Sequence, residues 1–147
     1  MRRRRDDSDE WQAMKAFVAR HAIGRPVKAQ ALVASDGFSA RYDLDRSAGV
    51  FSRPAHKLAG QSYVGRVLVL DAAKGGVASA WMLREMASRG VVPAALVFNR
   101  VNPILAQGAA FGEITLLAGF HADITAQVPH GAMVEIDPTT KVLRICD

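Results

Sequence analysis

The sequence predicts an α/β domain with a strand–helix–strand (βαβ) core, a C-terminal β-hairpin and an N-terminal helix. The chain has 147 residues, half of them apolar, which is enough to bury one hydrophobic core without disulfides. Residues 64–70 and 92–98 are mostly apolar segments typical of strands buried on both faces, and the segment between them has helical spacing. A right-handed parallel crossover is the expected geometry for such a unit.

At the N-terminus, the spacing of apolar residues predicts an amphipathic helix over residues 9–22. The apolar side chains from Trp11 to Val18 fall at helical intervals. We therefore divide the chain into a basic tail with this helix, residues 1–23, and a globular domain, residues 24–147. The apolar stripe of the helix could pack on the domain or on a partner subunit, and the sequence leaves both open.

A strand is expected next, over residues 27–33, because apolar and polar residues alternate there. The turn-forming residues 35–37 end it. Residues 40–62 are rich in Asp, Arg, Ser, Gly and Pro, and they predict a long ordered loop with one short strand near residues 49–51. A loop of this length in a compact domain is usually functional.

Cap and turn residues define the elements that follow. The helix after the first buried strand ends at a glycine, and an Asn-Pro pair at residues 102 and 103 supplies the cap and first turn of another helix. The turn Asp137–Thr140 joins the two strands of the hairpin. The expected elements are a helix over 77–89, a helix from 103 to about 110, a strand over 114–117, and hairpin strands over 133–136 and 142–145.

Composition and charge exclude several functional classes. The net charge of +5 is concentrated in Arg2–Arg5, and the other 15 cationic side chains nearly balance the 14 acidic ones. The body of the chain therefore lacks the basic stripe that nucleic-acid binding needs. Nucleic-acid binding through the arginine tail is the third functional hypothesis, beside the two that are given below. No apolar run reaches the roughly 18 residues of a membrane span, so we expect a cytoplasmic protein without membrane contact.

Cysteine usage limits the metal chemistry of the chain. Cys146 is the single cysteine, so a disulfide framework and a cysteine-built zinc site are excluded. An iron–sulfur cluster normally takes several thiolates, and the four histidines show no metal-ligand spacing. We therefore expect no metal or other cofactor to be bound by this chain alone.

The turn Lys74-Gly75-Gly76 is the first candidate site. It joins a buried strand to a helix, so backbone N–H groups, the helix dipole and the Lys74 ammonium would converge on a spot that attracts an anion. The alternative is a tight turn that needs small residues for steric reasons. Ser79 falls in the first turn of the helix, where its hydroxyl either caps the backbone or faces the anion.

The long polar loop holds further candidates. His56 can act at a site or serve as a hydrogen-bonded structural group. Asp43 and Asp45 can act as a pair of carboxylates or shape a turn. Arg41 and Arg53 carry guanidinium groups that suit a carboxylate or a phosphate, although surface solvation is the ordinary role of each.

Six segments in chain order carry a resemblance to a known family. They are Ser39 to Val50 with Asp45-Arg46-Ser47-Ala48-Gly49, His56 to Ser62, Gly65 to Val69, the Lys74-Gly75-Gly76 turn, Val92 to Leu96, and Pro103 to Ala109. From about Gly24 to the C-terminus, the chain resembles the aconitase X swivel domain. No single segment is specific, and the ordered series carries the resemblance.

The resemblance implies a swivelling β/β/α domain that forms the small subunit of an aconitase X type hydro-lyase. In that family a larger partner subunit carries an iron–sulfur cluster, and the active site forms between the two subunits. Known members dehydrate mevalonate 5-phosphate or cis-3-hydroxy-L-proline. The chain is then expected to dehydrate a small hydroxy acid with its large subunit and to be inactive alone. The alternative is a non-catalytic module of the same fold that binds a small acid or a partner protein.

The resemblance also assigns roles to single residues. The implied substrate-binding residues are Ser39, Asp45, His56, Lys74, Gly75 and Gly76. The family's usual base is a serine after an Arg/Lys-Gly pair, where this chain has Gly76. Ser79 lies three residues later. Either Ser79 has taken over as the catalytic base, or another group removes the proton, or this branch is not catalytic in the usual sense.

Two cations distinguish the chain from the family pattern. Arg46 and Lys57 stand where the family has proline, directly after Asp45 and His56. We expect both cations to lie beside the site, where they would suit a different or more anionic substrate.

Overall fold

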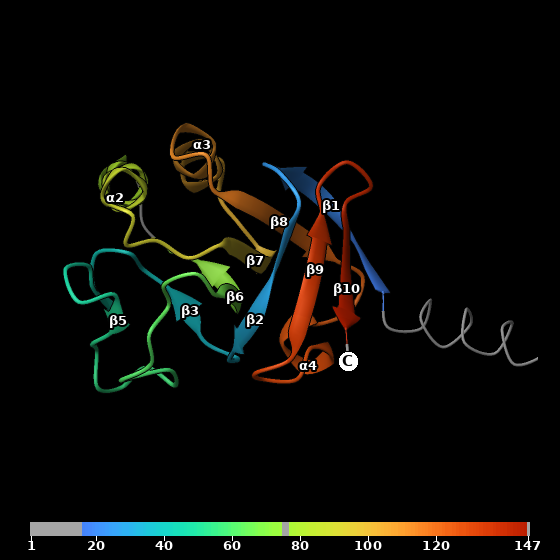
Figure 1. The fold of residues 1–147 in the computed structure, drawn as a ribbon, viewed down its shortest axis with the longest axis horizontal. Coiled ribbons are helices and arrows are strands. Elements are labelled where there is room, and N and C mark those ends of the chain that lie inside the picture. The colour runs from blue at the N-terminus through green and yellow to red at the C-terminus, as the bar shows by residue number, and fades with distance from the viewer. Residues whose placement is uncertain (1–15, 75–76, 147) are drawn as a thin grey trace, which may run out of the picture.

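The computed structural model describes residues 16–74 and 77–146. An eight-stranded sheet and a layer of two helices make up most of this part of the chain (Figure 1). The strands of the sheet are β1 (Ala16–Ile23), β2 (Val27–Val33), β3 (Gly37–Phe38), β6 (Val67–Ala73), β7 (Ala95–Arg100), β8 (Thr115–Phe120), β9 (Met133–Asp137) and β10 (Val142–Cys146). A separate pair is formed by β4 (Leu44–Asp45) and β5 (Val50–Phe51), and the helices are α2 (Val77–Arg89), α3 (Pro103–Phe111) and α4 (Ile124–Gln127).

Seven strands of the sheet close into a barrel. Neighbours follow the order β2-β9-β10-β1-β8-β7-β6-β3, and β2 also pairs with β6. β2 uses residues 27–30 to pair with β9 and residues 31–33 to pair with β6, whereas β3 is added outside the ring against the end of β6. Closure removes free sheet edges, so the backbone groups of these strands find partners inside the domain.

The parallel part of the barrel carries the two longer helices. β6, β7 and β8 are parallel neighbours, with α2 in the connection between β6 and β7 and α3 in the connection between β7 and β8. β9, β10 and β1 pair antiparallel. The result is the mixed α/β fold that the sequence predicts.

Two hydrophobic cores lie on the two faces of the parallel strands. Val69 and Val97 face the inside of the barrel, where they meet residues such as Leu143 from the antiparallel strands. Leu68 and Leu70 face the other way, into the core beneath α2 and α3. Because both faces are buried, these strands appear in the sequence as continuous apolar runs rather than alternating ones.

The two helices of the outer layer lie side by side on the sheet (Figure 1). Gly108 of α3 faces Ala80 of α2, and a Cβ built on Gly108 would lie 2.5 Å from the Ala80 Cα. This is well inside van der Waals contact, so the close approach of the helices requires glycine at this position. None of the described helices is long and apolar enough to span a membrane.

The strand β1 corrects the helix expected over residues 9–22. It pairs antiparallel with β10 through residues 16–18 and with β8 through residues 19–23. Hydrogen bonds to two neighbouring strands and the burial of Ala19 in the barrel core outweigh the local helical spacing. Residues 16–23 therefore belong to the sheet of the domain and not to a preceding tail. The earlier part of the expected helix and Arg2–Arg5 lie outside the described residues.

The short helix α4 is an element that the sequence pattern did not predict. Its buried residue Ile124 and the following Val128 enter the barrel core. Asp123 caps its N-terminus by accepting the Thr125 N–H at 3.0 Å. Hydrogen bonds from the Thr125 hydroxyl and the Asn99 amide hold the pKa of the Asp123 carboxyl below its usual value.

Candidate functional site

The candidate site lies at the end of β6, around Lys74, the residue that follows the strand. β3 runs parallel to this end of β6, with Gly37 opposite Ala72 and Phe38 opposite Ala73. The Lys74 N–H donates to the Phe38 carbonyl at 2.7 Å and so continues the pairing by one residue. α/β domains usually bind ligands at the carboxyl ends of parallel strands, which draws attention to this end of the sheet.

Gly37 leaves room for the Lys74 side chain. A Cβ built on Gly37 would lie 3.0 Å from Lys74 Cε and 3.5 Å from Nζ, so the lysine packs across the bare glycine backbone. Lys74 is exposed, and none of the described residues forms an ion pair with its ammonium. The charge of Lys74 is therefore available to an anionic ligand.

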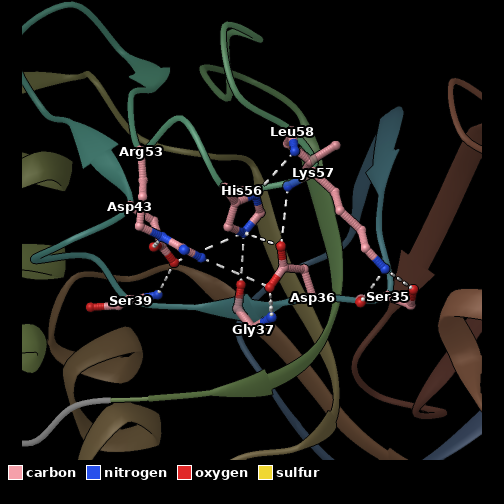
Figure 2. Close-up of polar contacts among 9 residues, drawn as sticks. All are labelled: Ser35, Asp36, Gly37, Ser39, Asp43, Arg53, His56, Lys57 and Leu58. Carbon is pink, nitrogen blue, oxygen red and sulfur yellow. Dashed lines mark hydrogen bonds and ion pairs between the residues drawn. The ribbon is translucent and has the colours of Figure 1, made fainter.

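His56 lies next to Gly37 and is 3% exposed (Figure 2). Its Nδ1 accepts the Leu58 N–H at 3.0 Å, and its Nε2 lies 2.8 Å from the Gly37 carbonyl oxygen. An accepting Nδ1 needs a free lone pair, so this arrangement assigns the neutral tautomer, which carries its proton on Nε2 and donates it to Gly37. The Phe51 ring stacks on the imidazole, with 4.7 Å between ring centroids. His56 thus fixes the Gly37 backbone and does not itself face solvent.

Asp36 holds the same segment from its other side. Its Oδ1 accepts the Gly37 N–H at 2.8 Å, and its Oδ2 accepts the Lys57 N–H at 3.1 Å (Figure 2). Desolvation acts to raise the pKa of Asp36, but the two backbone hydrogen bonds, and after them the nearby His56 and Arg53, outweigh it and keep this pKa below its usual value. The ionised carboxylate ties the loop around His56 to the start of β3.

A partly buried ion pair completes this network. Asp43 is 4% exposed; its Oδ2 accepts the Ser39 N–H at 2.8 Å, and its Oδ1 accepts from the Arg53 Nε. The Arg53 Nη2 also lies 3.9 Å from Asp36 Oδ1, so one guanidinium joins the two carboxylates. Ser39 is buried, and its hydroxyl oxygen accepts the Tyr42 N–H at 3.2 Å. The Ser39 side chain therefore shapes the start of the long loop.

Lys57 lies beside this network, but its ammonium is already bound. Its Nζ donates to the Ser35 hydroxyl oxygen at 2.8 Å and to the Ser35 carbonyl oxygen at 3.0 Å (Figure 2). The two cations of Lys57 and Arg53 balance the two carboxylates of Asp36 and Asp43. The net charge of the network around Gly37 is therefore close to zero. An exposed ammonium on such a fixed support can bind a carboxylate or a phosphate.

Asp45 and Arg46 lie away from Lys74, at the other end of α2. Both line a cavity with Glu85 and Arg89, which belong to the last turns of that helix. Asp45 accepts two backbone N–H groups of the following turn, each at 3.0 Å, which is an ordinary turn-forming role. Arg46 donates to a loop carbonyl at 2.9 Å. The long loop carries Arg46 to the far end of α2, so Arg46 stands beside Asp45 and not beside Lys74.

Ser79 is buried within the first turn of α2. It is 3% exposed and shares the inner face of the helix with Leu83 and Met86, which pack in the core. In the chain alone the residue Ser79 is therefore almost entirely buried, although it lies only five positions after Lys74 in the sequence. Gly75 and Gly76, the other expected members of the turn, lie outside the described residues.

The residues on this chain do not fit an iron–sulfur cluster. Within residues 16–74 and 77–146, no three His, Cys, Asp or Glu side chains are grouped so that they could hold a metal ion. Cys146, the single cysteine of the sequence, lies on β10.

Comparison with known proteins gives the family of this domain. A sequence model of the aconitase X swivel domain matches residues 16–145. The chain belongs to the aconitase X swivel domain family. Among its relatives, the phosphomevalonate dehydratase small subunit of Methanopyrus kandleri is 35% identical over 82% of this chain and 89% of the relative. The protein of the same name from Methanothrix thermoacetophila is 32% identical over 80% of this chain and 85% of the relative.

Solved structures show that the fold is that of aconitase X swivel domains. The crystal structure of Thermococcus kodakaraensis aconitase X (holo-form) matches with a TM-score of 0.83, over 90% of this chain and 98% of that chain, at 20% identity. The solution NMR structure of a UPF0107 protein matches with a TM-score of 0.80, over 90% of this chain and 99% of that chain, at 26% identity. The closed mixed sheet with its helical layer is thus shared with both.

The structure of this aconitase X swivel domain brings together only part of the set that the sequence suggested. Ser39, His56 and Lys74 meet around β3, whereas Asp45 lies elsewhere. Sequence reasoning missed Asp36, which was interpreted only as part of a turn. The Asp-Gly pair is a common turn signal. Nothing in its spacing reveals that the Asp36 carboxylate accepts the backbone N–H of Lys57, 21 residues later.

Proposed function

We propose that this swivel domain is the small subunit of an aconitase X type hydro-lyase that dehydrates a small hydroxy acid together with a larger subunit. The names of its relatives, which are small subunits of phosphomevalonate dehydratase, support both the class of reaction and the need for a partner. In this proposal the chain is inactive alone and its barrel and helical layer swivel as one β/β/α unit. The iron–sulfur cluster, with its Lewis-acid chemistry, belongs to the larger subunit.

The observation that carries the proposal is the exposed Lys74 ammonium at the carboxyl end of β6. In the proposal this ammonium binds an anionic group of the substrate in the cleft between the two subunits. The Lys74 side chain packs across the bare backbone of Gly37. The hydrogen bonds of His56 and Asp36 hold that backbone in place. Holding the substrate by its anionic group orients the carbon that loses its proton.

The same charge narrows the class of substrate. A lysine ammonium binds a carboxylate or a phosphate as a point charge and does not require a bidentate geometry. Mevalonate 5-phosphate offers both groups, and it is the substrate that the names of the relatives suggest testing first.

The base in this proposal is the Ser79 hydroxyl, and its burial makes a direct test necessary. Ser79→Ala in the assembled complex should lower turnover at least about 100-fold if this hydroxyl takes the proton, because general-base catalysis contributes about that much or more. Single-turnover rates and the amount of complex formed would be measured together. Turnover within about threefold of wild type, a barrier change of roughly 0.6 kcal/mol, would remove Ser79 from the reaction.

The complex itself provides the test of the proposed function. We would co-express the chain with the large subunit from the same organism, purify the pair without oxygen, and screen hydroxy acids for the appearance of a carbon–carbon double bond. We expect dehydration by the complex and none by either chain alone. A stable, cluster-loaded complex that dehydrates none of the hydroxy acids would contradict the proposal.

A second function is favoured by one observation, the glycine at position 76 where the family has its serine. In that case the domain is a non-catalytic module that binds a small acid or a partner protein. It would bind acids through Lys74, and the complex would show no turnover that depends on Ser79. Isothermal titration with hydroxy acids, run beside the activity screen, separates the two functions.

A further inference from the structure

We infer that the apolar groove between α2 and α3 is the docking surface for an apolar, carboxylate-bearing segment of the large subunit. The inference rests on the proposed function, which requires a partner chain, and adds the surface that the partner covers. We call this surface the α2–α3 groove. Its apolar walls are Val77, Trp81, Ile104 and Phe111.

The walls of the α2–α3 groove are unusually exposed for their size. Their exposed fractions run from 42% for Ile104 to 72% for Phe111, with Trp81 at 61%. Half of the large apolar side chains that are exposed in the described residues gather here, around a cavity of about 320 Å³. Single exposed apolar residues are ordinary, but a contiguous group of this kind marks an interaction site.

The groove is built into the helix packing. The contact between Gly108 and Ala80 brings the two helices together at the base, and large side chains stand on either side of it. Trp81 and Phe111 belong to helices whose other faces are fixed in the core by Leu83 and Leu105. The aromatic walls therefore stand on a backbone that is already fixed, so the helices need not be ordered when a partner binds.

The position of the groove indicates the large subunit as its occupant. Val77, one of its walls, is the first residue of α2 and lies three positions after Lys74 in the sequence. A chain that completes a site at Lys74 must cover the start of α2, and the next surface that it meets along this helix is the groove. The groove is thus continuous with the face that the proposed function assigns to the shared active site.

Charge defines the chemistry of the docking segment. Arg84 is the one charged residue that lines the groove among those described, and no acidic side chain lines it there. The Arg84 guanidinium lies over the Trp81 ring, 5.4 Å from its centroid. The groove therefore fits a segment with apolar side chains for the walls and an Asp or Glu for Arg84.

The test measures assembly of the full chain with its large subunit. Trp81→Glu and, separately, Phe111→Glu should weaken the complex at least about 30-fold, because each places a charge in an apolar contact centre. Val18→Glu is the matched control, since Val18 is 65% exposed on β1, outside the groove, and should change the dissociation constant less than about twofold. Isothermal titration gives the constants, and circular dichroism checks that each variant is folded.

The outcomes separate this inference from the function on which it rests. If wild type and both groove variants bind equally well and the complex still dehydrates, the docking inference is overturned and the proposed function stands. If the wild-type chain forms no complex, the proposed function fails and the inference fails with it. A groove that instead holds a second copy of this chain, seen as a dimer that Trp81→Glu dissociates without affecting the complex, would also overturn the inference.

Discussion

At the scale of single residues, His56 acts through its hydrogen bonds rather than through a charge. Its ring accepts from Leu58 and donates to Gly37, and it is buried against Phe51. Both backbone groups are left without these partners if the imidazole is removed. His56 is thus a structural support for Gly37, across which the Lys74 side chain packs.

We expect His56→Leu to lower the free energy of unfolding by about 2–4 kcal/mol, because it leaves a buried donor and a buried acceptor unsatisfied. The exposed His121 offers the matched control, and His121→Leu should change the same quantity by less than about 0.5 kcal/mol. Urea denaturation measures both variants. Equal stabilities of the two variants would show that the hydrogen bonds of His56 contribute nothing.

The Asp36 carboxylate predicts a pH dependence of stability. Its pKa is lowered in the folded chain, so its contribution is complete above the unfolded value of roughly 3.9 and is lost as pH falls through the lower folded value. Asp36→Asn should therefore cost stability near neutral pH, and the difference from wild type should shrink below about pH 4. Denaturation at a series of pH values gives this difference. A gap that stays constant from neutral to strongly acidic pH contradicts the ionised role.

At the scale of elements, local signals locate the helices α2 and α3 better than the ends of the strands, although they place a helix over the strand β1 and miss the short helix α4. The Asn102 side chain accepts the Leu105 N–H at 2.8 Å, as a cap residue before a proline should. β6, by contrast, continues past its apolar run to Ala73, because β3 pairs with its last residues. The ends of that strand depend on a partner that the local sequence does not reveal.

The close contact of α2 and α3 predicts that Gly108→Ala destabilises the domain. A Cβ there meets the Ala80 backbone at 2.5 Å, so the helices must separate, at a cost of about 1–3 kcal/mol that exceeds the gain in helix propensity. Gly112→Ala is the control, because its Cβ would have ordinary contacts at 3.4 Å and its φ of −81° suits alanine. Thermal unfolding measures the stability of both variants. A Gly108→Ala domain that is as stable as the Gly112→Ala control would contradict this packing.

At the scale of the whole molecule, the sequence predicts the mixed α/β fold and the family, but it does not predict the closure of the barrel. Closure depends on β2 changing neighbours half-way along its length and on β1 pairing with two strands from the C-terminal half. The candidate site is also assembled from separate parts of the chain, since its residues come from 36–43, 53–58 and 74. Lys74 could be suggested as an anion-binding residue from its turn alone. The residues that hold Gly37 in place beside it become apparent only when β3 pairs with β6.

The measurement that tests the central claim most directly is the steady-state kinetics of the assembled complex with Lys74→Gln. The account predicts that kcat/KM falls about 10- to 100-fold, the loss of a charge-assisted hydrogen bond to the substrate. Lys57→Gln, in which the neighbouring ammonium bound to Ser35 is removed, should stay within about threefold of wild type. A Lys74→Gln complex with wild-type kcat/KM would show that the end of β6 is not where the substrate is held.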